Sequence, residues 1–169
     1  MAVVGRAEAG MRAIGRGATV LQLRAPDLTT RDLERECAAL VRASTVPVVV
    51  SSRCDVALAC GAAGVNLPER DIGLADARAL MGDRLVGRSV HSVESALAAA
   101  NDGADYVIFG PVWASPSHPD GKPLGLDALA SAARAVSVPV IAIGGVDFER
   151  AVQCLAAGAA GYAGIRTFM

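Results

Sequence analysis

The sequence predicts a TIM (β/α)8-type barrel, and two observations lead to this fold class. First, a unit recurs in which an alanine-rich helical stretch ends at a glycine suited to the left-handed conformation, and a short strand follows. The four glycines are Gly17, Gly61, Gly103 and Gly158. Second, the strands are continuous apolar runs, which are typical of a parallel sheet covered by helices. Such repeats favour a single barrel domain over residues 1–169.

The elements follow from this unit in order along the chain. Helices are expected in the alanine-rich stretches Ala7–Arg16, Arg53–Cys60, Val93–Asn101 and Phe148–Ala157. Strands are expected near residues 18–23, 46–51, 64–67, 85–89, 105–109, 138–143 and 161–165. Pro47 and Pro139 stand at the entrances of two strands, where a missing backbone N–H is tolerated. This gives seven strands, one fewer than a complete barrel needs.

The predicted elements fall short of a complete barrel at the two ends of the chain. Ala2–Val4 reads as a stub of the first strand, because Gly5 interrupts the apolar run, and the last strand is followed almost at once by Met169. We therefore expect a barrel truncated at both ends, without most of its first strand and without its last helix. Its seam would expose backbone hydrogen-bonding groups. The alternative is an open doubly wound sheet, but no Gly-x-Gly-x-x-Gly follows a first strand, which disfavours the dinucleotide-binding version.

The composition of the chain indicates which kinds of partner and which cell compartment to expect. Sixteen cations against seventeen anions lack the basic footprint of a nucleic-acid-binding protein. No apolar run approaches a membrane span, and no signal peptide is evident, so we expect a cytoplasmic protein without membrane partners. The four cysteines form no Cys-x-x-Cys pair and are expected to be reduced, buried thiols rather than zinc ligands. Whether the protein forms a homo-oligomer is left open by the sequence.

The candidate site lies where barrels of this kind carry their chemistry, at the carboxyl ends of the strands. The strongest signal there is for phosphate. Gly144 and Gly145 follow one strand, Ile165 and Arg166 follow the next, and glycines let backbone N–H groups approach a phosphate that arginine also binds. The alternative is that the glycines only make tight turns.

The long segment Pro111–Pro123 has no periodicity and carries four prolines, which favours a lid over the site. It contains Ser115, Ser117 and His118, and His118 is the expected acid or base because histidine titrates near neutral pH. His91 is the second candidate. Its alternative role is to cap the next helix together with Ser92 and Glu94.

A series of motifs resembles one known superfamily of barrels, that of thiamine phosphate synthases and TenI-like thiazole tautomerases. The resemblance covers nearly the whole chain, from Gly17 to Phe168. The matching motifs are Gln22-Leu23-Arg24, Ser52-Arg53-Cys54-Asp55-Val56-Ala57, Gly64-Val65-Asn66-Leu67-Pro68, Gly87-Arg88-Ser89-Val90-His91-Ser92, Phe109-Gly110-Pro111-Val112 and Pro139-Val140-Ile141-Ala142-Ile143-Gly144-Gly145. The resemblance implies a small-molecule thiazole phosphate as ligand, bound by Gln22, Arg24, Ser89, Ser115, Ser117 and the phosphate residues named above.

For the synthase branch, the resemblance implies that a pyrimidine diphosphate joins a thiazole phosphate with loss of pyrophosphate and that Mg²⁺ assists. This chain departs from the synthase pattern. Pro26 stands at a lysine position, Ser51-Ser52 replaces an Asn-Asp pair, and His118 replaces the lysine of a Thr-Pro-Thr-Lys loop. Asp71 matches the second metal carboxylate and would hold Mg²⁺ weakly.

The tautomerase branch requires a phosphate cradle and an acid or base, but no cofactor. Its relatives commonly carry a histidine directly after Phe-Gly, where this chain has Pro111. We expect a TenI-like tautomerase of a thiazole carboxylate phosphate, with no cofactor. The alternatives are a thiamine phosphate synthase with a degraded metal site and a barrel that binds a phosphate of the thiamine pathway without catalysis.

Overall fold

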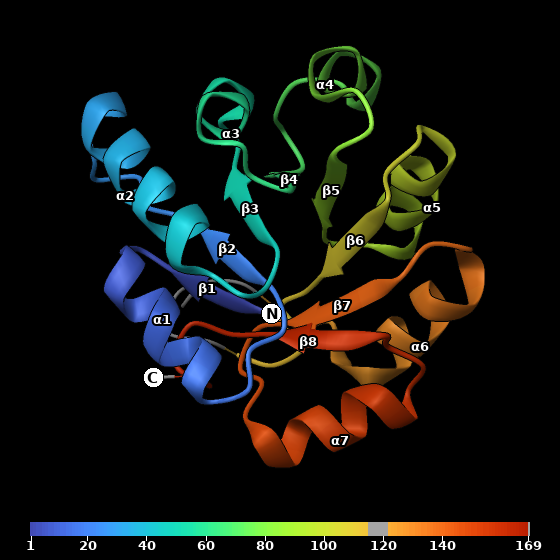
Figure 1. Cartoon of the computed structure of the whole chain (residues 1–169). Helices are drawn as coiled ribbons and strands as arrows, with labels where there is room; N and C mark the ends of the chain where they lie inside the picture. Colours follow the sequence, from blue (N-terminus) through green and yellow to red (C-terminus); the bar gives the residue numbers. More distant parts are fainter. Residues whose placement is uncertain (115–121, 169) are drawn as a thin grey trace.

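Eight parallel strands form a barrel with helices on its outside (Figure 1) in a computed structural model that describes residues 1–114 and 122–168. The strands are β1 (Ala2–Val4), β2 (Leu21–Leu23), β3 (Val48–Ser51), β4 (Gly64–Leu67), β5 (Leu85–Val90), β6 (Tyr106–Phe109), β7 (Val140–Ile143) and β8 (Gly161–Ala163). The helices in the described residues are α1 (Ala7–Gly15), α2 (Thr30–Ala43), α3 (Cys54–Cys60), α4 (Leu74–Met81), α5 (Val93–Asn101), α6 (Gly125–Ala135) and α7 (Phe148–Ala156). The predicted barrel is confirmed.

The seam of the barrel corrects one expectation. All three residues of β1 pair with β2, so Ala2–Val4 is a full strand and not a stub. On the other side, the Val3 N–H donates to the Gly164 carbonyl at 3.0 Å, and the Gly164 N–H donates to the Met1 carbonyl at 3.2 Å. Three residues suffice because β2 and β8 are equally short. The expected exposure of backbone groups along this seam is therefore wrong.

Several strands begin later than the apolar runs predict. The Ala18 N–H donates to the Ala13 carbonyl at 3.0 Å and so still belongs to the end of α1, which is why β2 begins at Leu21 rather than at residue 18. At the two Val-Pro-Val segments the strands begin after the proline, at Val48 and Val140. Proline has no N–H to give to the sheet, so pairing starts one residue later.

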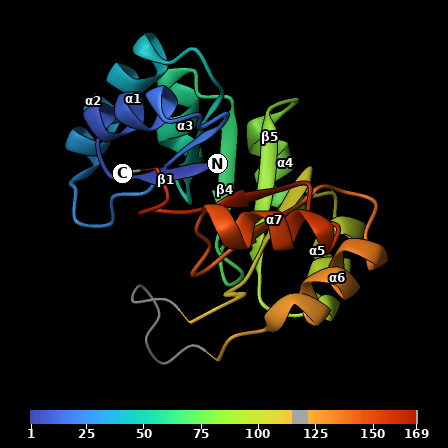
Figure 2. The same cartoon turned by 90° about the horizontal axis from the view of Figure 1, so that it is seen from below.

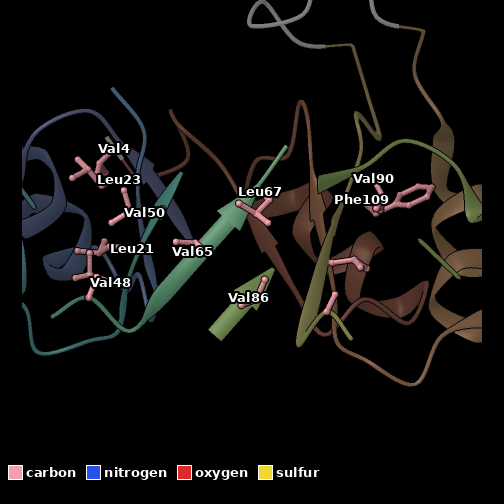
Figure 3. Packing of buried hydrophobic residues seen from close by; sticks show 14 of the residues in the cluster. Val4, Leu21, Leu23, Val48, Val50, Val65, Leu67, Val86, Val90 and Phe109 are labelled. Atoms are coloured by element: carbon pink, nitrogen blue, oxygen red, sulfur yellow. The ribbon is translucent and has the colours of Figure 1, made fainter. Parts of the chain in front are cut away.

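Alternation along the strands separates two apolar regions. Outward-facing side chains meet the helices and form the main core, ten of them labelled in Figure 3: Val4, Leu21, Leu23, Val48, Val50, Val65, Leu67, Val86, Val90 and Phe109. Inward-facing side chains fill the barrel, and they include Val3, Val49 and Ile108, which are also buried. Apolar side chains therefore lie on both sides of the sheet, which explains the continuous hydrophobic runs.

Glycine is required at two inward positions because larger neighbours occupy the space. A Cβ on Gly87 would lie 2.1 Å from the ring of Tyr106, and a Cβ on Gly64 would lie 2.0 Å from the Leu85 carbonyl oxygen. The Tyr106 hydroxyl donates to the Val65 carbonyl at 3.4 Å, and burial raises the pKa of this phenol. The amino end of the barrel is thus filled, which leaves open space only toward the carboxyl ends of the strands.

The helices α2, α5 and α7 begin at side-chain hydrogen bonds near the carboxyl ends of the strands. Thr29 caps α2, Ser92 and Ser95 form a capping box at α5, and Asp147 accepts the Arg150 N–H at 2.8 Å to cap α7. The view from below (Figure 2) separates α1, α2 and α3 from α5, α6 and α7 on opposite sides of the barrel. The loops before α2, α5 and α7 are therefore anchored by a strand on one side and a capped helix on the other.

Two further expectations concern the cysteines and membranes. Cys37, Cys54 and Cys154 are buried free thiols, as predicted, and Cys60 is half-buried. Burial raises the pKa of Cys37 to about 12, so this thiol stays protonated at neutral pH. Within residues 1–114 and 122–168, no helix has both the length and the apolar character needed to cross a membrane.

Candidate functional site

A cavity of about 550 Å³ opens at the carboxyl ends of the strands. This main cavity has the size and place of a small-molecule site. The charged residues that line it, within the described part of the chain, are three arginines and two carboxylates: Arg24, Arg150, Arg166, Glu69 and Asp147. The excess of positive charge favours an anionic ligand.

Two amide side chains form a polar floor inside the barrel. Gln22 is 4% exposed and Asn66 is 1% exposed, and both line the main cavity. The Asn66 Nδ2 donates to the Ser89 hydroxyl at 2.9 Å. The side-chain oxygens of Gln22 and Asn66 have no hydrogen-bond partner within the part of the chain that the structure describes. Buried acceptors without donors are costly, so this floor is suited to a ligand that brings N–H or O–H groups.

The predicted phosphate residues are brought together on one side of the main cavity. Gly144, Gly145, Ile165 and Arg166 all line it. The two glycines have φ of +95° and +64°, which other residues rarely adopt. Among the described residues, the N–H groups of Gly145, Ile165 and Arg166 donate to no acceptor. Free backbone donors beside a guanidinium are the usual components of a phosphate site.

Arg150 completes this side of the cavity and was not predicted. Its guanidinium donates to the Gly145 carbonyl at 2.7 Å and lies 5.2 Å from the centre of the Trp113 ring. A Cβ on Gly145 would lie 2.8 Å from the Trp113 Cβ, so the glycine also makes room for this segment. The sequence signal was available, since Arg150 stands in the first helical turn after the glycine pair.

His91 lines the main cavity, but it is not the helix cap that was considered for it. Ser92 caps α5 instead, and its partner is Ser95 rather than Glu94. The His91 Nδ1 lies in hydrogen-bond contact with the Gly110 carbonyl oxygen. Because a carbonyl only accepts, Nδ1 carries the proton in the neutral ring, and Nε2 keeps a free lone pair. His91 can therefore act as an acceptor or a base.

A second cavity of about 270 Å³ adjoins the first and shares Arg24, Ser51 and Pro68 with it. Ser52 and Arg53 also line it, and Ser52 has a φ of +63°, an uncommon value for a residue with a side chain. Arg53 forms two hydrogen bonds to Asp55, at 2.8 and 2.6 Å, which lower the pKa of Asp55 to about 2. Among the described residues, no carboxylate lines this second cavity.

The remaining predicted residues lie elsewhere. Asp71 lines neither cavity, and its Oδ1 accepts the Ile72 N–H at 2.8 Å. His118, Ser115 and Ser117 lie outside the described residues. Asn66 and Ser51 belong to the site but were not among the expected ligand-binding residues. A polar residue within the apolar run Gly64–Leu67 is the signal that could have found Asn66.

The described side chains do not by themselves assemble a complete set of metal ligands. Over residues 1–114 and 122–168, no three His, Cys, Asp or Glu side chains are grouped as metal ligands would be. Mg²⁺ needs several hard oxygen ligands, and Asp71, the one predicted carboxylate ligand, is turned to its own backbone. Arg24 is the arginine that lines both cavities, and it places positive charge where they adjoin.

Comparisons with known proteins agree with this geometry. A family model described as "Thiamine monophosphate synthase" matches residues 5–168. A thiamine-phosphate synthase of Chloroflexus aurantiacus is 43% identical over 155 residues, which cover 89% of this chain and 72% of that protein. A thiamine-phosphate synthase of Chlorobium luteolum is 41% identical over 157 residues, which cover 90% and 74%.

The solved structures show the same likeness in three dimensions. A thiamine phosphate pyrophosphorylase from Pyrococcus furiosus superimposes with a TM-score of 0.89 at 32% identity, over 97% of this chain and 83% of that one. Family match, relatives and architecture point the same way. The chain belongs to the thiamine monophosphate synthase family, and its place is in thiamine biosynthesis.

Proposed function

We propose that this protein is a thiamine phosphate synthase, which joins an aminopyrimidine diphosphate to a thiazole phosphate. This is the alternative that the sequence left open, and it replaces the tautomerase as our first choice. Family membership and relatives more than 40% identical support it. The observation that carries it is the pair of unpartnered acceptors on the floor of the main cavity, Gln22 Oε1 and Asn66 Oδ1.

The floor discriminates between the two candidate substrates by hydrogen-bond chemistry. The pyrimidine of thiamine carries an exocyclic amino group, which offers the N–H donors that the floor lacks. A thiazole carboxylate phosphate offers acceptors at its carboxylate and phosphate, and would leave both amide oxygens unpaired. Unpaired buried polar groups are costly, so the floor favours the aminopyrimidine.

The phosphate side of the main cavity suits the second substrate. Gly145, Ile165 and Arg166 would hold the phosphate of the thiazole opposite the floor. In the reaction, the bond between the pyrimidine methylene carbon and the diphosphate oxygen breaks, and the oxygen leaves with the electron pair. The lone pair of the thiazole nitrogen then forms the new C–N bond, so the attack needs no proton transfer.

The leaving diphosphate carries the largest developing charge, and Arg24 stands where the two cavities meet. We infer that Arg24, together with the hydroxyls of Ser51 and Ser52, stabilises this charge in the second cavity. Preorganised cations stabilise a charge that develops in the transition state.

A tautomerase is the second candidate, and the observation in its favour is His91. Its Nδ1 contact with Gly110 leaves Nε2 free as a base on a residue that lines the main cavity. Moving a ring proton needs such a base, while the synthase reaction does not. His118, the first candidate for this role from the sequence, stays a prediction.

Binding measurements test the floor directly. We expect the aminopyrimidine diphosphate to bind at least about tenfold more tightly than an analogue with hydrogen in place of the amino group, the scale of one to two hydrogen bonds. In Gln22→Leu the preference should shrink, whereas Gln153→Leu, an exposed change on α7, should keep it. Isothermal titration calorimetry gives both affinities. Equal affinity of the wild-type protein for the two compounds would exclude this role of the floor.

A further inference from the structure

A buried arginine outside the cavities takes part in no step proposed above. Arg88 lies on β5 between Gly87 and Ser89, which face the barrel interior, so its side chain faces outward. It is only 7% exposed. No carboxylate from residues 1–114 or 122–168 forms an ion pair with it, although buried charges are usually paired.

The partners of Arg88 are two backbone carbonyls of one short segment. One terminal nitrogen donates to the Pro68 carbonyl at 2.7 Å, and the other donates to the Ile72 carbonyl at 2.6 Å. The Pro68 carbonyl also accepts the Asp71 N–H at 3.2 Å, so the segment turns back on itself. The planar guanidinium fork thus joins both ends of this turn through two different nitrogens, whereas an ammonium would have to reach both carbonyls from one nitrogen.

The segment that Arg88 holds is a wall of the proposed substrate site. It connects β4 to α4 and begins two residues after Asn66 on the cavity floor. Pro68 lines both cavities, and Glu69 lines the main one. The position of this wall therefore depends on a residue that touches neither cavity.

We propose that Arg88 is a positioning residue that sets substrate affinity by fixing the Pro68–Ile72 wall. It does not contact the reacting atoms, and its effect passes through the backbone of the wall. The choice of ligand for its test rests on the proposed function, but the contact between Arg88 and the wall does not.

The test compares Arg88→Met and Arg88→Lys with a matched control. Arg78 also donates to backbone carbonyls, those of Gly82, Arg84 and Gly103, and it pairs with Asp105, but at the opposite end of the barrel. Hydrogen exchange of the Asp71 and Ile72 amides reports on the wall, and calorimetry with thiamine phosphate reports on the site. A loss of one or two charge-assisted bonds predicts about tenfold faster exchange and about tenfold weaker binding in Arg88→Met. Arg88→Lys keeps the charge but not the fork, and it should show most of both effects.

Arg78→Met should lower the melting temperature without changing either readout, which separates positioning from stability. The proposal is overturned if Arg88→Met exchanges and binds like the wild type. It is also overturned if exchange rises while affinity does not change. Should Arg88→Met not fold, Arg88→Lys decides by the same two measurements. If the wild-type protein does not bind thiamine phosphate, the proposed function fails, and the exchange rates and the affinity for inorganic pyrophosphate still decide the role of Arg88.

Discussion

At the scale of single residues, the site is made by polar groups that the fold leaves without partners. Gln22 and Asn66 carry buried amide oxygens with no donor in the described chain, and Gly145, Ile165 and Arg166 carry backbone donors with no acceptor. Folding alone gains nothing from the two buried amide oxygens, because they have lost their contact with water. A ligand with N–H donors at one end and a phosphate at the other would satisfy both sets. The unpaired groups of these residues therefore indicate which complementary groups the ligand carries.

Arg166 gives the residue-scale prediction. In Arg166→Ala, the affinity for thiazole phosphate should fall by about 1.5 kcal/mol, or roughly tenfold, since one charge-assisted hydrogen bond at an exposed site is lost. The affinity for the dephosphorylated thiazole should not change. Arg12→Ala, an exposed arginine change on α1, is the matched control. Equal wild-type affinity for the phosphorylated and dephosphorylated thiazole, measured by calorimetry, would contradict a phosphate site here.

At the scale of elements, the repeated helix, glycine and strand could be predicted because it is a local pattern. The same pattern cannot find α2 and α6, whose C-terminal caps Ser44 and Val136 are extended rather than left-handed. It also undervalues β1, because a three-residue strand is recognisable only by its neighbours. The strand β1 pairs with β2 on one side and with Gly164 on the other, and these two partners are far apart in the sequence.

Some residues of the candidate site could likewise be predicted from local sequence, and others could not. Gly144, Gly145 and Arg166 could be predicted because their spacing after two strands is local. The pairing of Ser92 with Ser95 at the start of α5, the contact of Arg150 with Gly145, and the side-chain oxygen of Asn66 that finds no donor among the described residues could not. Each depends on which side chain reaches a given backbone atom first in three dimensions.

Two glycine variants test the packing of the elements. Gly64→Ala places a Cβ 2.0 Å from the Leu85 carbonyl oxygen, and a backbone atom between two paired strands cannot move aside. We expect a loss of about 3 kcal/mol in the free energy of unfolding and a fall of roughly 6–12 °C in Tm. Gly15→Ala on α1 meets nothing within 4 Å and should stabilise by about 0.5–1 kcal/mol. Calorimetric melting compares them, and an unchanged Tm for Gly64→Ala would refute this account of the packing.

At the scale of the whole molecule, the barrel concentrates charge on one rim. Its amino end is filled by Tyr106 against Gly87, so ligands have access only from the carboxyl ends of the strands. Counting the residues that the structure describes, the main cavity there carries three arginines against two carboxylates, and a second cavity beside it carries arginine and serine without a carboxylate. Two adjoining anion-attracting cavities match a reaction between two phosphorylated substrates better than the rearrangement of one.

The central claim is that these cavities make thiamine phosphate, and product formation tests it most directly. The purified protein is incubated with the aminopyrimidine diphosphate and the thiazole phosphate, and thiamine phosphate and pyrophosphate are quantified together. We predict that both products appear in equal amounts, and that His91→Asn retains this activity because the attack of the thiazole nitrogen needs no base. The contradicting result is that no thiamine phosphate forms while the wild-type protein, but not His91→Asn, converts a thiazole carboxylate phosphate into its aromatic tautomer.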